Sequence, residues 1–127
     1  MLIRLLIIDD DIIMREILKD ALMEYPIIID EASNGWEGME KIKQNNYHVV
    51  LTDIIMPEKE GLELIREIKA KPNSVKVIAT SSGGGGSAKM YLQMAAEFGA
   101  DAIIEKPFTE NSLVELIQQI LSTHEQI

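Results

Sequence analysis

Polar or charged residues end four runs of apolar, strand-forming residues in this chain. The runs cover residues 5–8, 49–52, 77–79 and 102–105, and the side chains that end them are Asp9, Asp10, Asp53, Thr80 and Lys106. Helix-like segments separate the runs, so the strands are expected to lie parallel in one sheet with their C-terminal ends along one edge. Open α/β sheets bind ligands at that edge. The sequence therefore predicts that three carboxylates, a hydroxyl and an ammonium meet at one place.

The carboxylates are candidates for a metal site. Asp9, Asp10 and Asp53 would repel one another at short range unless a cation neutralises them. Mg²⁺ prefers oxygen ligands and commonly takes only a few carboxylates. On its own, the run that ends at Asp11 fits a helix N-cap as well as a metal site. Asp53 favours the metal interpretation, because residues 54–57 are a poor context for a cap.

Lys106 and Thr80 extend the chemistry. Lys106 precedes Pro107. A cis peptide bond before proline costs little free energy, and it would allow the turn to direct the ammonium toward the carboxylates. The alternative for Lys106 is a lysine exposed to solvent at the entrance of a loop, and the alternative for Thr80 is a purely structural role. A metal, an aspartate, a hydroxyl and a lysine together suit phosphoryl transfer onto a carboxylate. His48 begins a strand and His124 lies in the tail, so we expect neither to act as a general base.

Composition limits the class of protein. The 127 residues suit one domain, and 46% hydrophobic with 26% charged residues indicates a globular chain. Because cysteine is absent, disulfides and thiolate chemistry are excluded. A net charge of −9 and a pI of about 4.6 disfavour direct nucleic-acid binding. With neither a signal peptide nor a membrane-length apolar run, we expect a cytoplasmic protein without a membrane partner.

Strand-like runs begin near residues 2, 27, 48, 75 and 101, and helical patterns lie between them. We expect one (βα)5 domain over residues 1–127, with a frayed tail at 122–127. Gly99 is expected to cap the fourth helix and Thr109 to start the fifth. The apolar stripes expected to face the sheet are Ile13, Met14, Ile17, Leu18 and Ala21; Leu62, Ile65 and Ile68; Tyr91, Met94, Ala95 and Phe98; and Leu113, Leu116, Ile117, Ile120 and Leu121.

Together these motifs resemble the receiver domain of two-component response regulators, the chemotaxis-type fold. The resemblance is carried by residues 6–11, by 53–57 with Gly61, by 79–81 and by 105–108. It covers essentially the whole chain. It implies a three-layer, doubly wound, flavodoxin-like α/β fold whose parallel five-stranded sheet has the order 2-1-3-4-5.

The resemblance also implies a metal site and a phosphorylation site. Asp53 would be the phosphoacceptor and a ligand of Mg²⁺. Asp10 would bind the ion directly, Asp9 directly or through water, and the backbone carbonyl of Ile55 would be a further ligand. No organic cofactor is implied.

The remaining implications concern the switch and its partners. Thr80 would be the switch hydroxyl and Lys106 its salt-bridge partner at the phosphoryl group. The phosphodonor would be a phosphohistidine on a sensor kinase or phosphotransfer protein. Output would pass to an effector protein at the face formed by the fourth helix, fifth strand and fifth helix. We expect a stand-alone signalling domain that assists its own phosphorylation and dephosphorylation. The resemblance does not determine its oligomeric state.

The sequence departs from the family pattern in three places. Ile103 replaces the usual aromatic switch residue, Glu60 replaces an aspartate, and glycines occupy positions 83–86. The glycine run lacks the residues of a nucleotide-binding loop, and we expect it to be mobile without phosphate. Because Ile55 and Ser82 cannot orient a hydrolytic water as an acid or amide could, we expect a long-lived phosphoryl group.

Two other functions remain as alternatives. A metal-dependent phosphatase with an aspartyl nucleophile needs an acid two residues beyond it to protonate the leaving group. Ile55 occupies that position and argues against this class. A degenerate receiver that acts only as a docking scaffold is disfavoured by the complete acidic set together with Thr80 and Lys106.

Overall fold

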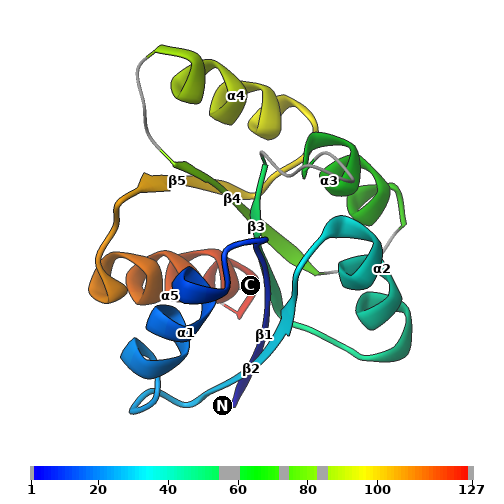
Figure 1. Ribbon diagram of the computed structural model, residues 1–127. Coiled ribbons are helices and arrows are strands. Elements are labelled where there is room, and N and C mark those ends of the chain that lie inside the picture. Colours follow the sequence, from blue (N-terminus) through cyan, green and yellow to red (C-terminus); the bar gives the residue numbers. More distant parts are fainter. Residues whose placement is uncertain (1, 55–60, 72–74, 83–85, 126–127) are drawn as a thin grey trace.

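The computed structural model describes residues 2–54, 61–71, 75–82 and 86–125. Five parallel strands form one sheet in the order β2-β1-β3-β4-β5, which confirms the predicted fold class (Figure 1). The strands are β1 (Ile3–Ile8), β2 (Ile27–Ala32), β3 (Val49–Asp53), β4 (Lys76–Ser82) and β5 (Ala102–Lys106). The helices are α1 (Ile12–Ala21), α2 (Gly35–Gln44), α3 (Gly61–Ala70), α4 (Gly86–Glu97) and α5 (Glu110–Glu125).

Helices cover both faces of the sheet, α1 and α5 on one face and α2, α3 and α4 on the other (Figure 1). Alternate residues of each strand therefore enter different cores. In β1, Leu5 and Ile7 pack in the core with α1 and α5, whereas Leu6 and Ile8 pack in the core with α2 to α4. This double burial explains why the central strands are continuously apolar.

Polar side chains fix where the helices begin. Asp11 accepts hydrogen bonds from backbone amides at the start of α1, and Asn34 does the same for α2. Thr109 Oγ1 accepts from the Ser112 amide, which confirms it as the start of α5. Gly99 follows α4 with a φ of 116°, in agreement with the left-handed cap expected there.

The stripe predicted for α1 is partly wrong. Ile13 and Ile17 are 67% and 56% exposed, whereas Leu18 and Leu22 are buried. The segment is apolar on more than one side, so its periodicity does not determine which side faces the sheet. Met14 joins the core shared with α5, and the exposed isoleucines remain at the surface.

One further expectation needs correction. In α4, Tyr91 is 40% exposed, whereas Leu92 and Ala95 are buried. The structure describes α5 to Glu125, and fraying of residues 122–127 stays a prediction. Among the described helices, none is both long and apolar enough to cross a membrane.

Candidate phosphoacceptor and metal site

The C-terminal strand ends bring the predicted residues together. Asp53 of β3 pairs in register with Thr80 of β4, and paired residues of neighbouring strands share a face. Asp9, Asp53, Thr80 and Lys106 all continue the alternation of strand positions that pack toward α1 and α5. The site therefore lies on one side of the sheet edge, as the parallel topology requires.

The carboxylates of Asp9, Asp10 and Asp53 form a cluster. One oxygen from each lies within 4.8 Å of the others, a spacing that one small cation can bridge. Asp9 and Asp53 are 3% and 6% exposed, and Asp10 is exposed. Two buried carboxylates beside a solvent-accessible one suit a hard divalent ion that keeps part of its water shell.

Lys106 reaches this cluster from β5. Its Nζ lies 2.8 Å from Asp9 Oδ2 and 3.2 Å from Asp53 Oδ2. The following peptide bond, to Pro107, is cis. Burial opposes the charge on Lys106, but the hydrogen bond to Asp9 and the charges of both aspartates outweigh it and raise the pKa of Lys106 above its ordinary 10.5. The ammonium therefore stays charged at neutral pH.

The three residues of the acidic run 9–11 do not all belong to the carboxylate cluster. Asp11 is the N-cap of α1. Asp9 Oδ1 accepts a hydrogen bond of 2.9 Å from the Asp11 amide, while its other oxygen faces Lys106. The capping interpretation is therefore confirmed for Asp11, and the metal interpretation of Asp9 and Asp10 stays a prediction.

Thr80 lies at the site with its hydroxyl buried. It is 2% exposed, and its Oγ1 has no hydrogen-bond partner among the described residues. Ser81 Oγ is in the same state, but strand alternation directs it to the opposite face. A buried hydroxyl without a partner is costly, and the one on Thr80 lies in register with Asp53. It has the position of a donor for a group bound to that aspartate.

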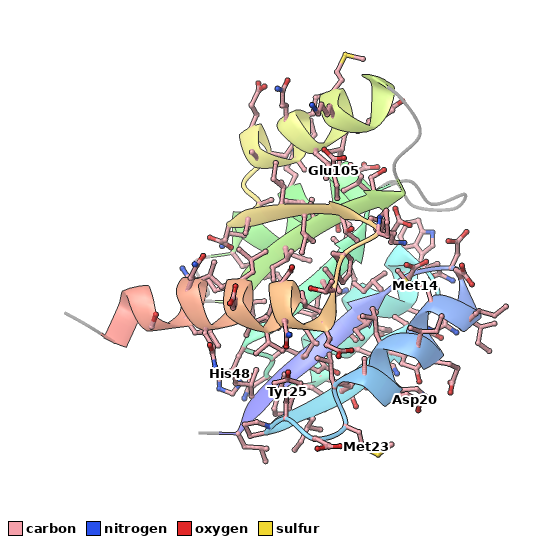
Figure 2. All side chains as sticks on the ribbon, turned by 90° about the vertical axis from the view of Figure 1, so that its left-hand side faces the viewer. Met14, Asp20, Met23, Tyr25, His48 and Glu105 are labelled. Carbon is pink, nitrogen blue, oxygen red and sulfur yellow. The ribbon has the colours of Figure 1, made fainter. Side chains whose placement is uncertain are left out.

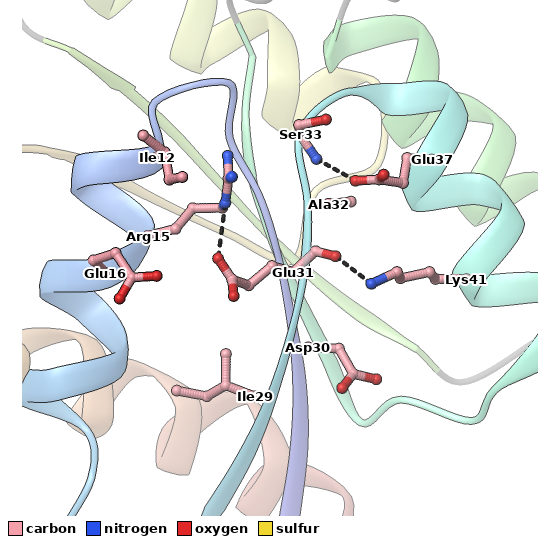
Figure 3. A pocket seen from close by; sticks show the side chains of 10 residues that line it. All are labelled: Ile12, Arg15, Glu16, Ile29, Asp30, Glu31, Ala32, Ser33, Glu37 and Lys41. Atoms are coloured by element: carbon pink, nitrogen blue, oxygen red, sulfur yellow. Dashed lines mark hydrogen bonds and ion pairs between the residues drawn. The ribbon is translucent and has the colours of Figure 1, made fainter.

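Sequence reasoning missed one contact of the site. Arg15 of α1 donates from Nη1 to the backbone carbonyl of Asp9. Its Nε donates to Glu31 of β2 (Figure 3). A basic residue on a short amphipathic helix is an ordinary surface pattern, and only the tertiary structure brings it to the end of β1. The sequence offered no signal for its partners.

Other predicted residues lie elsewhere. Ile55, Glu60 and positions 83–85 are outside the described residues. Ile103 is 41% exposed on β5. His48 lies at the end of the sheet where the strands begin, and its Nδ1 accepts from the Arg4 amide at 2.9 Å (Figure 2).

Residues 5–118 match the model of the response regulator receiver domain family. The chain belongs to this family. It is 38% identical to the chemotaxis protein CheY of Thermotoga maritima, covering 92% of this chain and 96% of that protein. It is 35% identical to CheY of Bacillus subtilis, covering 94% and 98%. A CheY-like receiver domain structure from Methanospirillum hungatei superposes with a TM-score of 0.87 at 28% identity, covering 99% of this chain and 98% of that one.

Membership gives the site its context. Receiver domains are signalling domains of two-component systems, where they interact with histidine kinases and effectors. They bind Mg²⁺ at an acidic pocket, and in this receiver the corresponding cluster is Asp9, Asp10 and Asp53.

Proposed function

We propose that this receiver is a phosphorylation switch in which Mg²⁺-dependent phosphoryl transfer to Asp53 changes the binding of an effector protein. The observation that carries the proposal is the surroundings of Asp53. It is a buried carboxylate, close to two other carboxylates, paired with Lys106 and in register with an unpartnered hydroxyl. Such a site concentrates groups that bind a phosphoryl group and its counter-ion.

The transfer itself needs little from the protein beyond positioning. A carboxylate oxygen of Asp53 forms a bond to phosphorus as the P–N bond of a phosphohistidine breaks, and the electron pair returns to the imidazole. Bound Mg²⁺ supplies charge neutralisation for the phosphoryl oxygens. Lys106, already 3.2 Å from Asp53 Oδ2, is in reach to pair with one of those oxygens.

The metal would be held by Asp9, Asp10 and Asp53, with the backbone carbonyl of Ile55 as a further ligand. The fit rests on the donor set, which consists of carboxylate oxygens at short mutual distance. In the phosphorylated state the hydroxyl of Thr80 would donate to a phosphoryl oxygen and gain the partner that it otherwise lacks. This gain is the differential interaction that would shift the conformational equilibrium.

The α4–β5 surface supports an effector site. A cavity of about 510 Å³ lies there, lined by Leu92, Ile103 and Glu105 among others. Ile103 exposes 41% of its surface there. Apolar groups around a concave surface suit a peptide or helix of a partner protein.

The phosphodonor protein would dock along α1. Ile13 and Ile17 lie one turn apart on this helix, both more than half exposed, and the helix starts next to the acidic cluster. Exposed apolar residues grouped beside a reactive site indicate a protein-binding surface. We therefore expect the phosphohistidine-bearing domain to cover these isoleucines as it presents its phosphoryl group to Asp53.

Glutamine substitutions test the docking surface. The double variant Ile13→Gln with Ile17→Gln should slow phosphotransfer from the cognate donor protein about tenfold or more, since apolar anchors dominate such contacts. Transfer from a small acyl phosphate should be unchanged. The control is Met23→Gln, which alters a similarly exposed residue in the turn after α1, away from the acidic cluster (Figure 2). Equal slowing with both donors would contradict the docking proposal.

Incubation with Mg²⁺ and acetyl phosphate distinguishes the three functions. The switch predicts one phosphoryl group per chain that persists long enough to be isolated. A phosphatase predicts continuous phosphate release with little phosphoprotein, and a docking scaffold predicts no reaction. Intact-protein mass spectrometry with a phosphate-release assay measures both quantities, and either of the last two results would reject the proposal.

A further inference from the structure

Arg15 connects Glu31 of β2, the outer strand of the sheet, to Asp9 of the acidic cluster. A cleft of about 480 Å³ lies between α1, β2 and the start of α2, and Arg15, Glu31 and Lys41 are among the residues that line it (Figure 3). The Arg15 side chain is only 11% exposed, and its Nε lies 2.9 Å from Glu31 Oε1. Its Nη1 donates to the carbonyl oxygen of Asp9.

That carbonyl belongs to the peptide that joins Asp9 to Asp10. The peptide unit is planar and rigid, so a hydrogen bond to its oxygen fixes the direction in which the chain leaves β1 toward Asp10. The other groups of Asp9 are held as well, its amide by the Ala32 carbonyl at 3.1 Å and its carboxylate by Lys106 and the Asp11 amide. Arg15 therefore controls the remaining polar group of this residue.

Glu31 is itself held in place. Lys19 Nζ lies 2.7 Å from Glu31 Oε2, and Lys41 Nζ donates to the Glu31 carbonyl at 2.5 Å. The hydrogen bond from Lys19, together with that from Arg15, lowers the pKa of Glu31 against the opposing effect of burial. The carboxylate is thus ionised at neutral pH, and its strand register opposite Ile7 fixes where it meets the guanidinium.

We propose that Arg15 is a positioning residue for the divalent-cation site, aimed by Glu31 at the peptide between Asp9 and Asp10. The inference rests on the proposed function, because it concerns the Mg²⁺ of that same site. Arg15 has two opposing effects on Mg²⁺ affinity. Its positive charge near the carboxylates weakens cation binding, whereas its grip on the peptide preorganises the ligands. Since Glu31 offsets the charge at 2.9 Å, positioning is the larger effect.

Loss of the Arg15 charge would lower the Kd for Mg²⁺, whereas loss of its positioning contact would raise it. The direction of the change in Kd therefore distinguishes the two effects. In calorimetric titrations with Mg²⁺, Arg15→Met should raise the Kd about tenfold, the usual range for residues that orient ligands. Glu31→Gln should raise it less, because the amide still accepts from Arg15. Lys19→Met is the matched control. It removes the same charge one turn along α1 and from the same Glu31 carboxylate, but its hydrogen bonds go to Glu31 and Glu16.

A second readout is independent of the metal. In the metal-free protein, the amide of Asp11, which donates to Asp9 Oδ1 at 2.9 Å, should exchange with solvent faster in Arg15→Met than in wild type or Lys19→Met. Thermal unfolding establishes that each variant is folded. Should Arg15→Met fail to fold, Arg15→Lys carries the test, because it keeps the positive charge but cannot donate to both Glu31 and the Asp9 carbonyl. An unchanged Kd in that variant rejects the inference.

Other outcomes separate this inference from the proposed function. An Arg15→Met protein that binds Mg²⁺ as tightly as wild type, or more tightly, rejects positioning and leaves the switch intact. A Lys19→Met protein weakened to the same degree also rejects it, because the loss would then follow from the ion pairs of Glu31 that Lys19 and Arg15 share, and not from the Asp9 contact. A wild-type protein without Mg²⁺ affinity would reject both proposals.

Discussion

The buried, unpartnered hydroxyl of Thr80 favours a switch role over a purely structural one. The sequence allowed either a structural threonine or a switch hydroxyl at the end of β4. The structure buries the side chain without a hydrogen-bond partner, so a purely structural role would leave a polar atom that contributes nothing to the fold.

Valine substitutions at two buried threonines test this difference. Thr80→Val replaces an unpartnered hydroxyl with a methyl group and should raise the free energy of unfolding by about 1 kcal/mol without Mg²⁺. Thr52→Val should lower it by about 1 kcal/mol, because Thr52 Oγ1 donates to the Asp53 carbonyl at 3.0 Å. Urea unfolding measures both changes. Equal destabilisation by the two substitutions would show that Thr80 has a partner in the resting protein.

Lys106 is the residue on which the apo site depends most. Lys106→Met removes the ammonium that pairs with the buried carboxylates of Asp9 and Asp53 and should lower the free energy of unfolding by about 3 kcal/mol. Added Mg²⁺ should recover part of this loss. The control Lys69→Met breaks a pair of 2.9 Å with Asp101 away from the site and should show no such recovery. Identical Mg²⁺ responses would contradict the shared site.

The pH dependence of the same variant follows from the raised pKa of Lys106. A lysine whose pKa is higher in the folded than in the unfolded protein adds stability that is complete below the unfolded pKa of about 10.5. That stability is lost as pH rises through the folded pKa. The difference in unfolding free energy between wild type and Lys106→Met should therefore be constant from neutral pH to about pH 10 and shrink above it.

At the scale of elements, strands were more predictable than helix faces. Central strands are buried on both sides, so every run of apolar residues is informative about them. α1 carries apolar residues on more than one side, and neither Ile13 nor Ile17 reaches the core. Their exposure could not be read from periodicity, because binding surfaces and core faces use the same residue types.

The backbone of Gly61, at the start of α3, packs closely against Asp53 and Ile54. A Cβ there would lie 2.3 Å from Ile54 Cα and 2.6 Å from the Asp53 carbonyl oxygen. Gly61→Ala should therefore lower the free energy of unfolding by about 1–3 kcal/mol. It should also weaken Mg²⁺ binding, since the backbone that carries Asp53 must move.

Gly38→Ala is the matched control for this packing. Its Cβ would lie 2.5 Å from Ile8 Cδ1, the far end of a flexible side chain. The better helix propensity of alanine offsets the adjustment, so stability and Mg²⁺ affinity should change little. Comparable losses for both glycines in denaturant unfolding would argue against a special role for the Gly61 contact.

At the scale of the whole molecule, topology explains why the site was predictable. Parallel strands joined by helices place every strand end on one edge, so four short polar endings in the sequence sufficed to predict the cluster. Arg15 and Glu31 escaped this reasoning because Arg15 lies on a helix and Glu31 lies within β2, one residue before its end, so neither follows a strand. Contacts between elements follow from packing, which a single sequence does not encode in any local pattern.

The most direct test of the account is to locate the phosphoryl group. The protein is incubated with Mg²⁺ and acetyl phosphate, and borohydride then reduces the acyl phosphate to an alcohol that peptide mass spectrometry can place. We predict modification at Asp53, lost without Mg²⁺ and in Asp53→Asn. Modification at another residue, or undiminished labelling of Asp53→Asn, would contradict the assignment of Asp53 as the phosphoacceptor.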